Sequence, residues 1–389
     1  MKSLNVALVA GLALLGLAGA WYGYKVLYLR DSKLEIKPGP NLETKLDQYV
    51  QAFVDQGTFS GSVLVAKDGK ILLCKGYGMA NYELDVPNTP QTKFRLASVS
   101  KQFTAMAIMQ LQEKGLLNVN DTLSKYIPDY PDGDKITLHH LLTHTSGIFN
   151  YSDLPELREI EVKPHAVEQV IQLFKNKPLS FRPGEKYSYS NSGYTLLAYI
   201  IEKVSGKTYE TVLQEQIFGP IGMYNSGYDK ASLVLKNRAS GYVKVNEELA
   251  NAPYIDMSSP AGDEGLLYST VEDMYLWDRA LYTDKLVSRK SLETIFAPHI
   301  RVTQQIPDAD GYYYGYGWFN RKCCGGHTVV EHNGGIGGFF AQIHRCLDDD
   351  VCVIVLSNFD HMRAVPIGRG LAAILFGEKY VMPQKYIAV

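Results

Sequence analysis

The chain has 389 residues, of which 46% are hydrophobic and 21% charged, as in an ordinary globular protein. Lys and Arg number 39 against 41 Asp and Glu, so the formal net charge is −2. The sequence contains no basic block, which argues against nucleic acid as the main partner.

The first 24 residues form a segment of their own. The stretch LNVALVAGLALLGLAGAWYGY follows Lys2 and carries no charge until Lys25. It is interpreted as a signal peptide, with a small-x-small cleavage site at Ala18-Gly19-Ala20, or as a membrane anchor over residues 4–24. Both alternatives export the rest of the chain to a periplasmic or extracellular location. An uncleaved segment would also hold the protein to the membrane.

Residues 25–42 are predicted to be a linker, because two prolines interrupt regular structure there. The folded domain is predicted over residues 43–380. Its first stretch, LETKLDQYVQAFVDQG, predicts an amphipathic helix that ends at Gly57. The next, GSVLVAKDGKILLCKGYGMA, alternates apolar and polar residues around Asp68-Gly69 and predicts a β-hairpin.

Residues 103–290 are predicted to be mostly helix and loop. The C-terminal part returns to strands, namely GYGWFN, HTVVEHNG, FFAQIHRC and VCVIVLSN. A last helix is expected at about 364–376. The pattern predicts an α+β fold, in which an antiparallel sheet is built from both ends of the chain and a mostly helical lobe is inserted between them.

The five cysteines fall mainly near the C-terminal strands, at positions Cys74, Cys323, Cys324, Cys346 and Cys352. Export permits disulfides. A turn in the glycine-rich stretch near 334–338 would place Cys324 roughly opposite Cys346, which makes this pair the candidate disulfide. Five free thiols are the alternative. A metal cluster of Cys323, Cys324 and His327 matches no standard zinc spacing.

The stretch LASVSKQFTAMAIMQLQEKG places Ser98 three residues before Lys101 at the start of an apolar helix. Positions i and i+3 share a helix face, and the N–H groups at a helix start favour a developing negative charge. Because burial disfavours the charged form of lysine, the amine can serve as base for the serine hydroxyl. A serine cap followed by a solvated lysine would give the same short pattern.

The stretch FRPGEKYSYSNSGYTLLAYIIEKVSG places Tyr189 and Asn191 on a loop just before an apolar helix closed by Gly206. A phenol near a lysine can relay a proton. The Asn191 amide can both hold the lysine side chain and bind a substrate carbonyl. A capping loop with a core tyrosine is the structural alternative.

The stretch HNGG at 332–335 ends a predicted strand. Glycine there lets a substrate approach the backbone closely. The N–H groups of Gly335 and Ser98 could form an oxyanion hole. His332 could orient the phenol of Tyr189 or attract a substrate carboxylate, although a hairpin with an incidental histidine is also possible.

Ser98-x-x-Lys101, Tyr189-x-Asn191 and His332-x-Gly334, in this order, resemble the motifs of the penicillin-recognising serine hydrolases, which include class C β-lactamases, DD-peptidases and related esterases. The stretches HLLTHTSGI, IFGPIGM and AGDEGLLYSTVEDMYLWDRALY resemble the same group. The resemblance covers roughly residues 45–375. It implies a β-lactamase/transpeptidase-like fold with the site in the cleft between sheet and helical lobe.

The resemblance also implies residue roles. Ser98 would be the nucleophile, with Lys101 and Tyr189 handling protons. The implied substrate-binding residues are Asn191, His332, Gly334 and Gly335. Histidine at 332 replaces the lysine of β-lactamases, and it is largely neutral near pH 7, so strong β-lactamase activity is not expected.

Other chemistry has less support. His140 and His144 are four residues apart, but the glutamate of H-E-x-x-H is missing. GGIGG at 334–338 lacks the strand-to-helix context of a nucleotide loop. The sequence therefore predicts no metal and no cofactor.

Taken together, these patterns predict an exported serine hydrolase that acts through an acyl-enzyme on amide or ester bonds of a small-molecule or peptide substrate. A DD-carboxypeptidase-like or D-amino-acid peptidase is favoured. A β-lactamase or a small-ester esterase of the same fold is the alternative. A non-catalytic penicillin-binding sensor or structural protein is the alternative of another class. The sequence fixes no oligomeric state.

Overall fold

The computed structural model describes residues 41–230, 232–246, 248–256, 267–303, 311–323, 326–359 and 363–383. The predicted signal or anchor segment and nearly all of the predicted linker lie outside these residues. Among the residues described, no helix combines the length and the apolar character needed to cross a bilayer.

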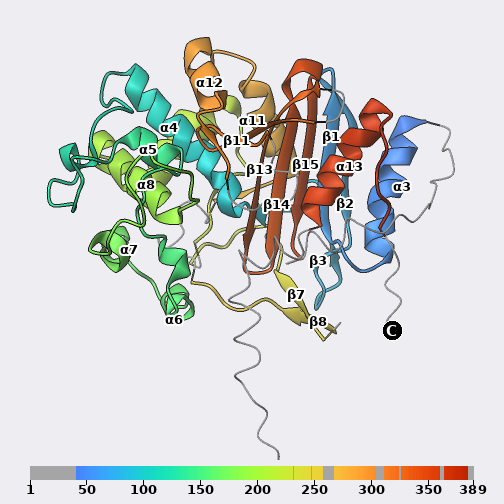
Figure 1. Cartoon of the computed structure of the whole chain (residues 1–389). Coiled ribbons are helices and arrows are strands. Elements are labelled where there is room, and N and C mark those ends of the chain that lie inside the picture. The colour runs from blue at the N-terminus through green and yellow to red at the C-terminus, as the bar shows by residue number, and fades with distance from the viewer. Residues whose placement is uncertain are drawn as a thin grey trace, which may run out of the picture.

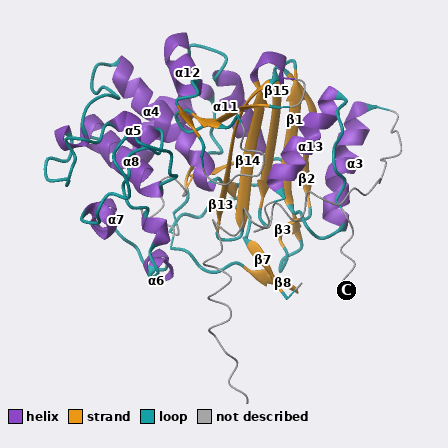
Figure 2. Ribbon diagram, viewed as in Figure 1, coloured by secondary structure: helices purple, strands orange, loops and turns teal. Residues whose placement is uncertain are grey.

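One eight-stranded antiparallel sheet organises the molecule (Figure 1, Figure 2). In sheet order its strands are β10 (Ile300–Arg301), β11 (Tyr313–Tyr314), β12 (Phe319–Lys322), β13 (Thr328–Ile336), β14 (Phe339–Cys346), β15 (Val351–Ser357), β1 (Gly61–Lys67) and β2 (Lys70–Tyr77). Strand β1 pairs with β15, so both ends of the chain build the sheet, as predicted. The hairpin predicted around Asp68-Gly69 is confirmed as β1 and β2.

Three small sheets contain the other strands that the structure describes. They consist of β3 (Met79–Asn81) with β4 (Val86–Pro87), of β5 (Phe94–Arg95), β9 (Leu267–Ser269) and β6 (Gly227–Tyr228), and of β7 (Tyr242–Val245) with β8 (Glu248–Asn251).

The alternation of side chains along β1 separates two hydrophobic cores. Val63 and Val65 face a core that includes residues of α3 (Leu42–Asp55) and α13 (Ala364–Phe376), the first and last helices predicted from the sequence. Leu64 and Ala66 face the other core, which includes α11 (Val271–Ala280). Because successive residues of a strand point to opposite faces, one strand serves both cores. Figure 1 shows α3 and α13 side by side on one flank of the sheet.

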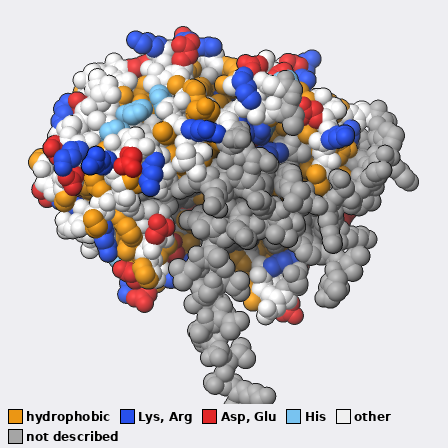
Figure 3. Space-filling view, viewed as in Figure 1, with side chains coloured by type: hydrophobic (Ala, Val, Ile, Leu, Met, Phe, Trp, Pro, Cys, Tyr) orange, Lys and Arg blue, Asp and Glu red, His pale blue; other side chains and the backbone are white. Residues whose placement is uncertain are grey.

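The inserted lobe is mainly helical, as predicted. Its helices are α4 (Lys101–Glu113), α5 (Leu138–Leu142), α6 (Leu157–Glu161), α7 (Val167–Lys175), α8 (Asn191–Ser205), α9 (Tyr209–Leu213), α10 (Gly219–Ile221) and α12 (Arg289–Phe296). Short 3₁₀ turns lie at Ala97–Ser100, Leu123–Lys125, Tyr151–Asp153 and Leu347–Asp349, and a π-helical turn lies at Gln214–Phe218. On the face seen in Figure 3, basic and acidic side chains intermingle, in keeping with the balanced composition.

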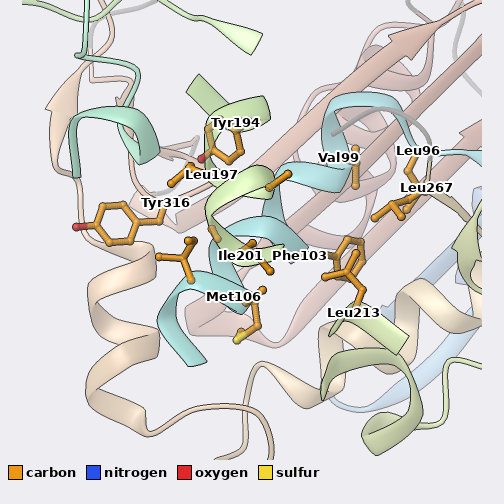
Figure 4. Packing of buried hydrophobic residues seen from close by; sticks show 14 of the residues in the cluster. Leu96, Val99, Phe103, Met106, Tyr194, Leu197, Ile201, Leu213, Leu267 and Tyr316 are labelled. Carbon is orange, nitrogen blue, oxygen red and sulfur yellow. The ribbon is translucent and has the colours of Figure 1, made fainter. Parts of the chain in front are cut away.

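Helix α4 lies at the centre of the molecule. Every residue from Lys101 to Leu111 is buried. Phe103 and Met106 pack in one cluster with Leu197 and Ile201 of α8 (Figure 4). The two helices that open with candidate catalytic residues are therefore held together by a shared apolar core.

The predicted hairpin is confirmed as β13 and β14, with its turn inside the predicted stretch 334–338, but the register of its strands differs from the expected one. Its turn lies at Gly337-Gly338, where both glycines have positive φ, and β13 continues through Ile336. This register pairs Cys346 with Val329, so the expected alignment of Cys346 with Cys324 is wrong. Cys324 itself lies outside the described residues. Cys346 has a free, buried thiol that hydrogen-bonds to Cys323.

The stretch GYGWFN is only partly a strand. Its first four residues form a bend between β11 and β12, and the strand begins at Phe319. The bend lies against α4: a Cβ atom on Gly317, which has φ +78°, would come within 2.8 Å of the Lys101 carbonyl oxygen. Close packing against the backbone of α4 therefore bends the chain where the sequence pattern indicates a strand.

Candidate active site

Ser98 lies in the 3₁₀ turn Ala97–Ser100, which leads directly into α4. N–H groups at the start of a helical turn have no partner within it, so the Ser98 N–H is free of the turn's own hydrogen bonds. Ala97 has a φ of 47°, which is uncommon for a residue other than glycine and typical of strained backbone at functional sites. Ser98 is partly exposed, in contrast to its buried neighbours Ala97 and Val99.

Lys101 is fully buried, with 0% of its surface exposed. Its Nζ lies 3.3 Å from Ser98 Oγ and 2.9 Å from Asn191 Oδ1. The same Nζ lies 5.1 Å from the centre of the Tyr189 ring. The lysine is therefore a candidate base that is buried in contact with the candidate nucleophile. The alternative of a solvated lysine is excluded.

Tyr189 and Asn191 flank the start of α8, as the sequence predicted. Asn191 is the first residue of the helix, and Gly206 caps its other end with a φ of 67°. The Asn191 side chain is held from both sides, because Oδ1 accepts from Lys101 and Nδ2 donates to Ser152 Oγ over 2.7 Å. The amide orientation is thus fixed, with one Nδ2 hydrogen left for a substrate carbonyl.

His332 is buried, with 2% of its surface exposed. Its Nδ1 lies 2.7 Å from the Asn333 carbonyl oxygen, so the ring proton belongs on Nδ1. Its Nε2 lies 3.0 Å from the Tyr314 hydroxyl and accepts a hydrogen bond from it. Both ring nitrogens are engaged.

Burial and the nearby Lys101 charge lower the pKa of His332 to about 3. The ring is therefore neutral at ordinary pH. In this arrangement it supplies neither a cation for a substrate carboxylate nor a free nitrogen for the Tyr189 phenol. The two ring centres are 6.4 Å apart, so His332 belongs to the wall of the site.

Strand β13 passes directly beside the nucleophile. Its ladder with β12 ends at the pair Phe319–Glu331, and the segment beyond it lies against the turn that carries Ser98. A Cβ atom on Gly334 would lie 2.5 Å from Ser98 N and 2.6 Å from Leu96 O. Glycine is required here because two backbones approach without room for a side chain. Gly335 is exposed at the same edge.

The structure thus brings Ser98, Lys101, Tyr189, Asn191 and Gly334 into one site, with Gly335 at its edge and His332 in its wall. An accessible hydroxyl, a buried amine and two backbone segments at a partly exposed site are the components of acyl transfer. Within the described residues, no group of three or more His, Cys, Asp and Glu side chains is arranged to hold a metal.

Three residues of the site were missed from the sequence. Ser152 orients Asn191, Tyr314 binds His332, and His144 packs on Tyr189 with ring centres 4.2 Å apart. The sequence analysis considered His144 only within the flanking motif HLLTHTSGI and, with His140, as a possible metal ligand, and not as a neighbour of Tyr189. Ser152 and Tyr314 stand in no motif, and the sequence contained no signal for them.

Residues 46–375 match the family model described as Beta-lactamase. The chain is 31% identical over 360 residues to a penicillin-binding protein of Bacillus subtilis (strain 168), covering 89% of this chain and 78% of the relative. It is 29% identical over 315 residues to a teichoic acid D-alanine hydrolase of Staphylococcus aureus, covering 80% and 72%. The solved octameric penicillin-binding protein homologue from Pyrococcus abyssi has a TM-score of 0.77 and 30% identity, covering 86% of this chain and 78% of that chain.

Proposed function

Because this chain belongs to the Beta-lactamase family and is a serine hydrolase, we propose that it cleaves esters and amides of D-amino acids through an acyl-enzyme on Ser98. The contact between Ser98 Oγ and the fully buried Lys101 Nζ, at 3.3 Å, carries this proposal. The expected fold, with a helical lobe set into an antiparallel sheet, is that of the family.

In the first half of the reaction, Ser98 Oγ attacks the substrate carbonyl carbon and its proton passes to Lys101. The N–H groups of Ser98 and Gly335 would stabilise the oxyanion. Tyr189 would then pass its phenolic proton to the leaving alcohol or amine as the bond to it breaks, and Lys101 would replace that proton with the one it took from Ser98. In the second half, water gives a proton to the Lys101–Tyr189 pair and attacks the ester carbonyl carbon. The bond to Ser98 Oγ then breaks, Oγ takes that proton, and the D-amino acid is released.

The neutral His332 favours substrates that carry no carboxylate beside the scissile bond. A cation at this position would attract such a carboxylate, but both nitrogens of His332 are engaged within the protein. A D-aminoacyl ester or amide meets this condition, and the similarity to a D-alanine hydrolase supports it. A DD-carboxypeptidase substrate does not meet it, although the similarity to penicillin-binding proteins keeps that activity as the second candidate.

The apolar segment at residues 4–24 supports export of the domain, either through a cleaved signal or on a membrane anchor. A substrate in the cell envelope would fit that location. Fractionation of expressing cells with N-terminal sequencing of the product distinguishes the two routes, because cleavage after Ala20 gives a mature chain that begins at Trp21.

A matched substrate set tests the proposal. The set contains a D-alanyl-D-alanine peptide, the same peptide with a C-terminal amide, a D-alanyl glycerol ester and a chromogenic cephalosporin, each with Ser98→Ala as control. The proposal predicts the highest kcat/KM for the D-alanyl ester, a higher value for the peptide amide than for the free acid, and no turnover by the variant. A clear preference for the free acid would instead establish the carboxypeptidase, and turnover by Ser98→Ala would exclude both.

A further inference from the structure

His144 lies directly behind the site and takes part in none of the steps above. It is 1% exposed and has a left-handed backbone, with a φ of 58°. This conformation is uncommon for residues other than glycine and is tolerated best by asparagine, aspartate and histidine. Such a backbone conformation persists only where the surrounding structure holds it in place, and residues of this kind cluster at functional sites.

Three consecutive residues before α8 are anchored by His144. The Ser188 N–H donates to its backbone oxygen over 2.9 Å, and the Ser190 N–H donates to its Nδ1 over 3.2 Å. Between these two bonds, the ring of Tyr189 packs on the imidazole at 4.2 Å and 34°. One residue therefore holds the segment on both sides of the candidate proton-transfer residue.

The Tyr189 phenol itself is not fixed by any hydrogen bond among the described residues. Its hydroxyl is thereby left for the nucleophile and the substrate, and its position depends on how the ring packs. The rings closest to it in the described structure are His144, at 4.2 Å, and His332, at 6.4 Å. His144 is thus the ring nearest to Tyr189, which also packs against the cluster of Tyr187, Val302, Tyr312 and Tyr314.

The imidazole of His144 also has a defined charge and tautomer. Because Nδ1 accepts from Ser190, the ring proton belongs on Nε2. Burial, together with the charge of nearby Lys101, holds the pKa of His144 well below its usual value. A neutral ring can support Tyr189 without placing a positive charge of its own beside the Lys101 amine.

We propose that His144 is a positioning residue that holds the Tyr189 phenol in the place where it transfers a proton during acyl transfer. The observation that carries this inference is the pair of contacts from one imidazole, a hydrogen bond to Ser190 N and a ring contact with Tyr189. The inference rests on the proposed function, in which Tyr189 delivers a proton to the leaving group.

The variant His144→Asn separates the two contacts. Asparagine tolerates the left-handed backbone, and its Oδ1 can take the place of Nδ1 as acceptor for Ser190, but it has no ring to support Tyr189. The substitution should lower kcat on the order of 10- to 100-fold, since small misplacements of a reacting group have effects of this size. KM should stay within about twofold, because the buried His144 offers almost no surface to a substrate.

A double-mutant cycle with Tyr189→Phe gives the decisive readout, measured as kcat on the D-alanyl ester. If His144 acts through the phenol, His144→Asn should have almost no further effect once the hydroxyl is gone. Equal losses in both backgrounds would show a general structural role and overturn the inference alone. No loss in Tyr189→Phe itself would overturn the proton route of the proposed function, and this inference with it.

Two further variants complete the test, one as a substitute for His144→Asn and one as a control. If His144→Asn fails to fold, His144→Phe provides the test, because it keeps a ring but loses the acceptor for the Ser190 N–H. This variant should lower kcat, and a wild-type kcat would overturn the inference. His299→Asn is the matched control, because it removes a similar histidine–tyrosine stack, at 4.4 Å from Tyr316, outside the site. It should leave kcat within about twofold of the parent, and a loss as large as that of His144→Asn would count against a specific role.

Discussion

Lys101 Nζ lies 3.3 Å from Ser98 Oγ on a side chain with no exposed surface. The buried position follows from α4, whose first eleven residues are all buried between the sheet and the helical lobe. Since residues i and i+3 share one helix face, the local sequence and the tertiary core both act to place the amine and the hydroxyl in contact. In the proposed mechanism, the side chain at position 101 must therefore reach Ser98 Oγ and accept its proton.

The substitution Lys101→Arg should lower the rate of acylation at least about 100-fold, because a guanidinium stays protonated and cannot accept the serine proton. Stopped-flow measurement of the acylation burst checks this. Lys175→Arg is the control, since Lys175 is also buried but pairs with Asp129 outside the site. Comparable acylation by Lys101→Arg would show that the lysine is not the base.

Gly334 and Gly335 should respond very differently to alanine. A Cβ at 334 would lie 2.5 Å from Ser98 N, whereas at 335 the nearest atom is a side-chain carbon of Phe340 at 3.1 Å, which can move. We expect Gly334→Ala to abolish measurable turnover by moving β13 away from the nucleophile, and Gly335→Ala to keep activity within about tenfold, since it retains its N–H. Steady-state kinetics with thermal melts compares them. Full activity of Gly334→Ala would show that β13 does not need this close approach.

The stability of the protein should fall with acid partly because of His332. Its pKa is near 3 in the folded protein and near 6.5 in the unfolded chain, so between these values unfolding takes up a proton. The free energy of unfolding therefore rises with pH across this window, by up to ~1.4 kcal/mol per pH unit for this one group, and its contribution is complete above about pH 6.5.

The variant His332→Gln removes this term and leaves the other buried histidines in place. Urea denaturation at several pH values between 4 and 6.5 should therefore show that the free energy of unfolding rises less steeply with pH for the variant. The difference in slope should correspond to the uptake of close to one proton on unfolding. Parallel curves would mean that His332 is already charged in the folded protein, and the preference for substrates without a carboxylate would lose its basis.

Much of the fold was predictable because periodicity and turn residues act locally. The helices α3 and α13, the hairpin at Asp68-Gly69 and the paired C-terminal strands follow from short stretches read alone. The register of the β13–β14 hairpin was not predictable, because the sequence offers four glycines within the five residues where the turn was expected. Close approach to Ser98, not a turn, explains Gly334, and only the packed structure makes that visible.

The chemistry of the site was predictable in its motifs but not in its surroundings. The spacing of Ser98 and Lys101 points to their contact, because a helix fixes it. The low pKa of His332 follows from its burial in the folded protein, and its Nε2 is occupied by the Tyr314 hydroxyl, which comes from another strand. Likewise, the contact of His144 with Tyr189 joins segments 45 residues apart in number, and no local pattern encodes it.

The most direct test of the account is the mass of the intact protein after reaction with a fluorophosphonate or a penicillin, followed by mapping of the labelled peptide. We predict a single adduct per chain, located on Ser98, and no adduct in Ser98→Ala. The matched control Ser100→Ala, in the same 3₁₀ turn, should retain the adduct. Labelling of Ser98→Ala to the wild-type level, or an adduct mapped to any other residue, would contradict the assignment of Ser98 as the nucleophile.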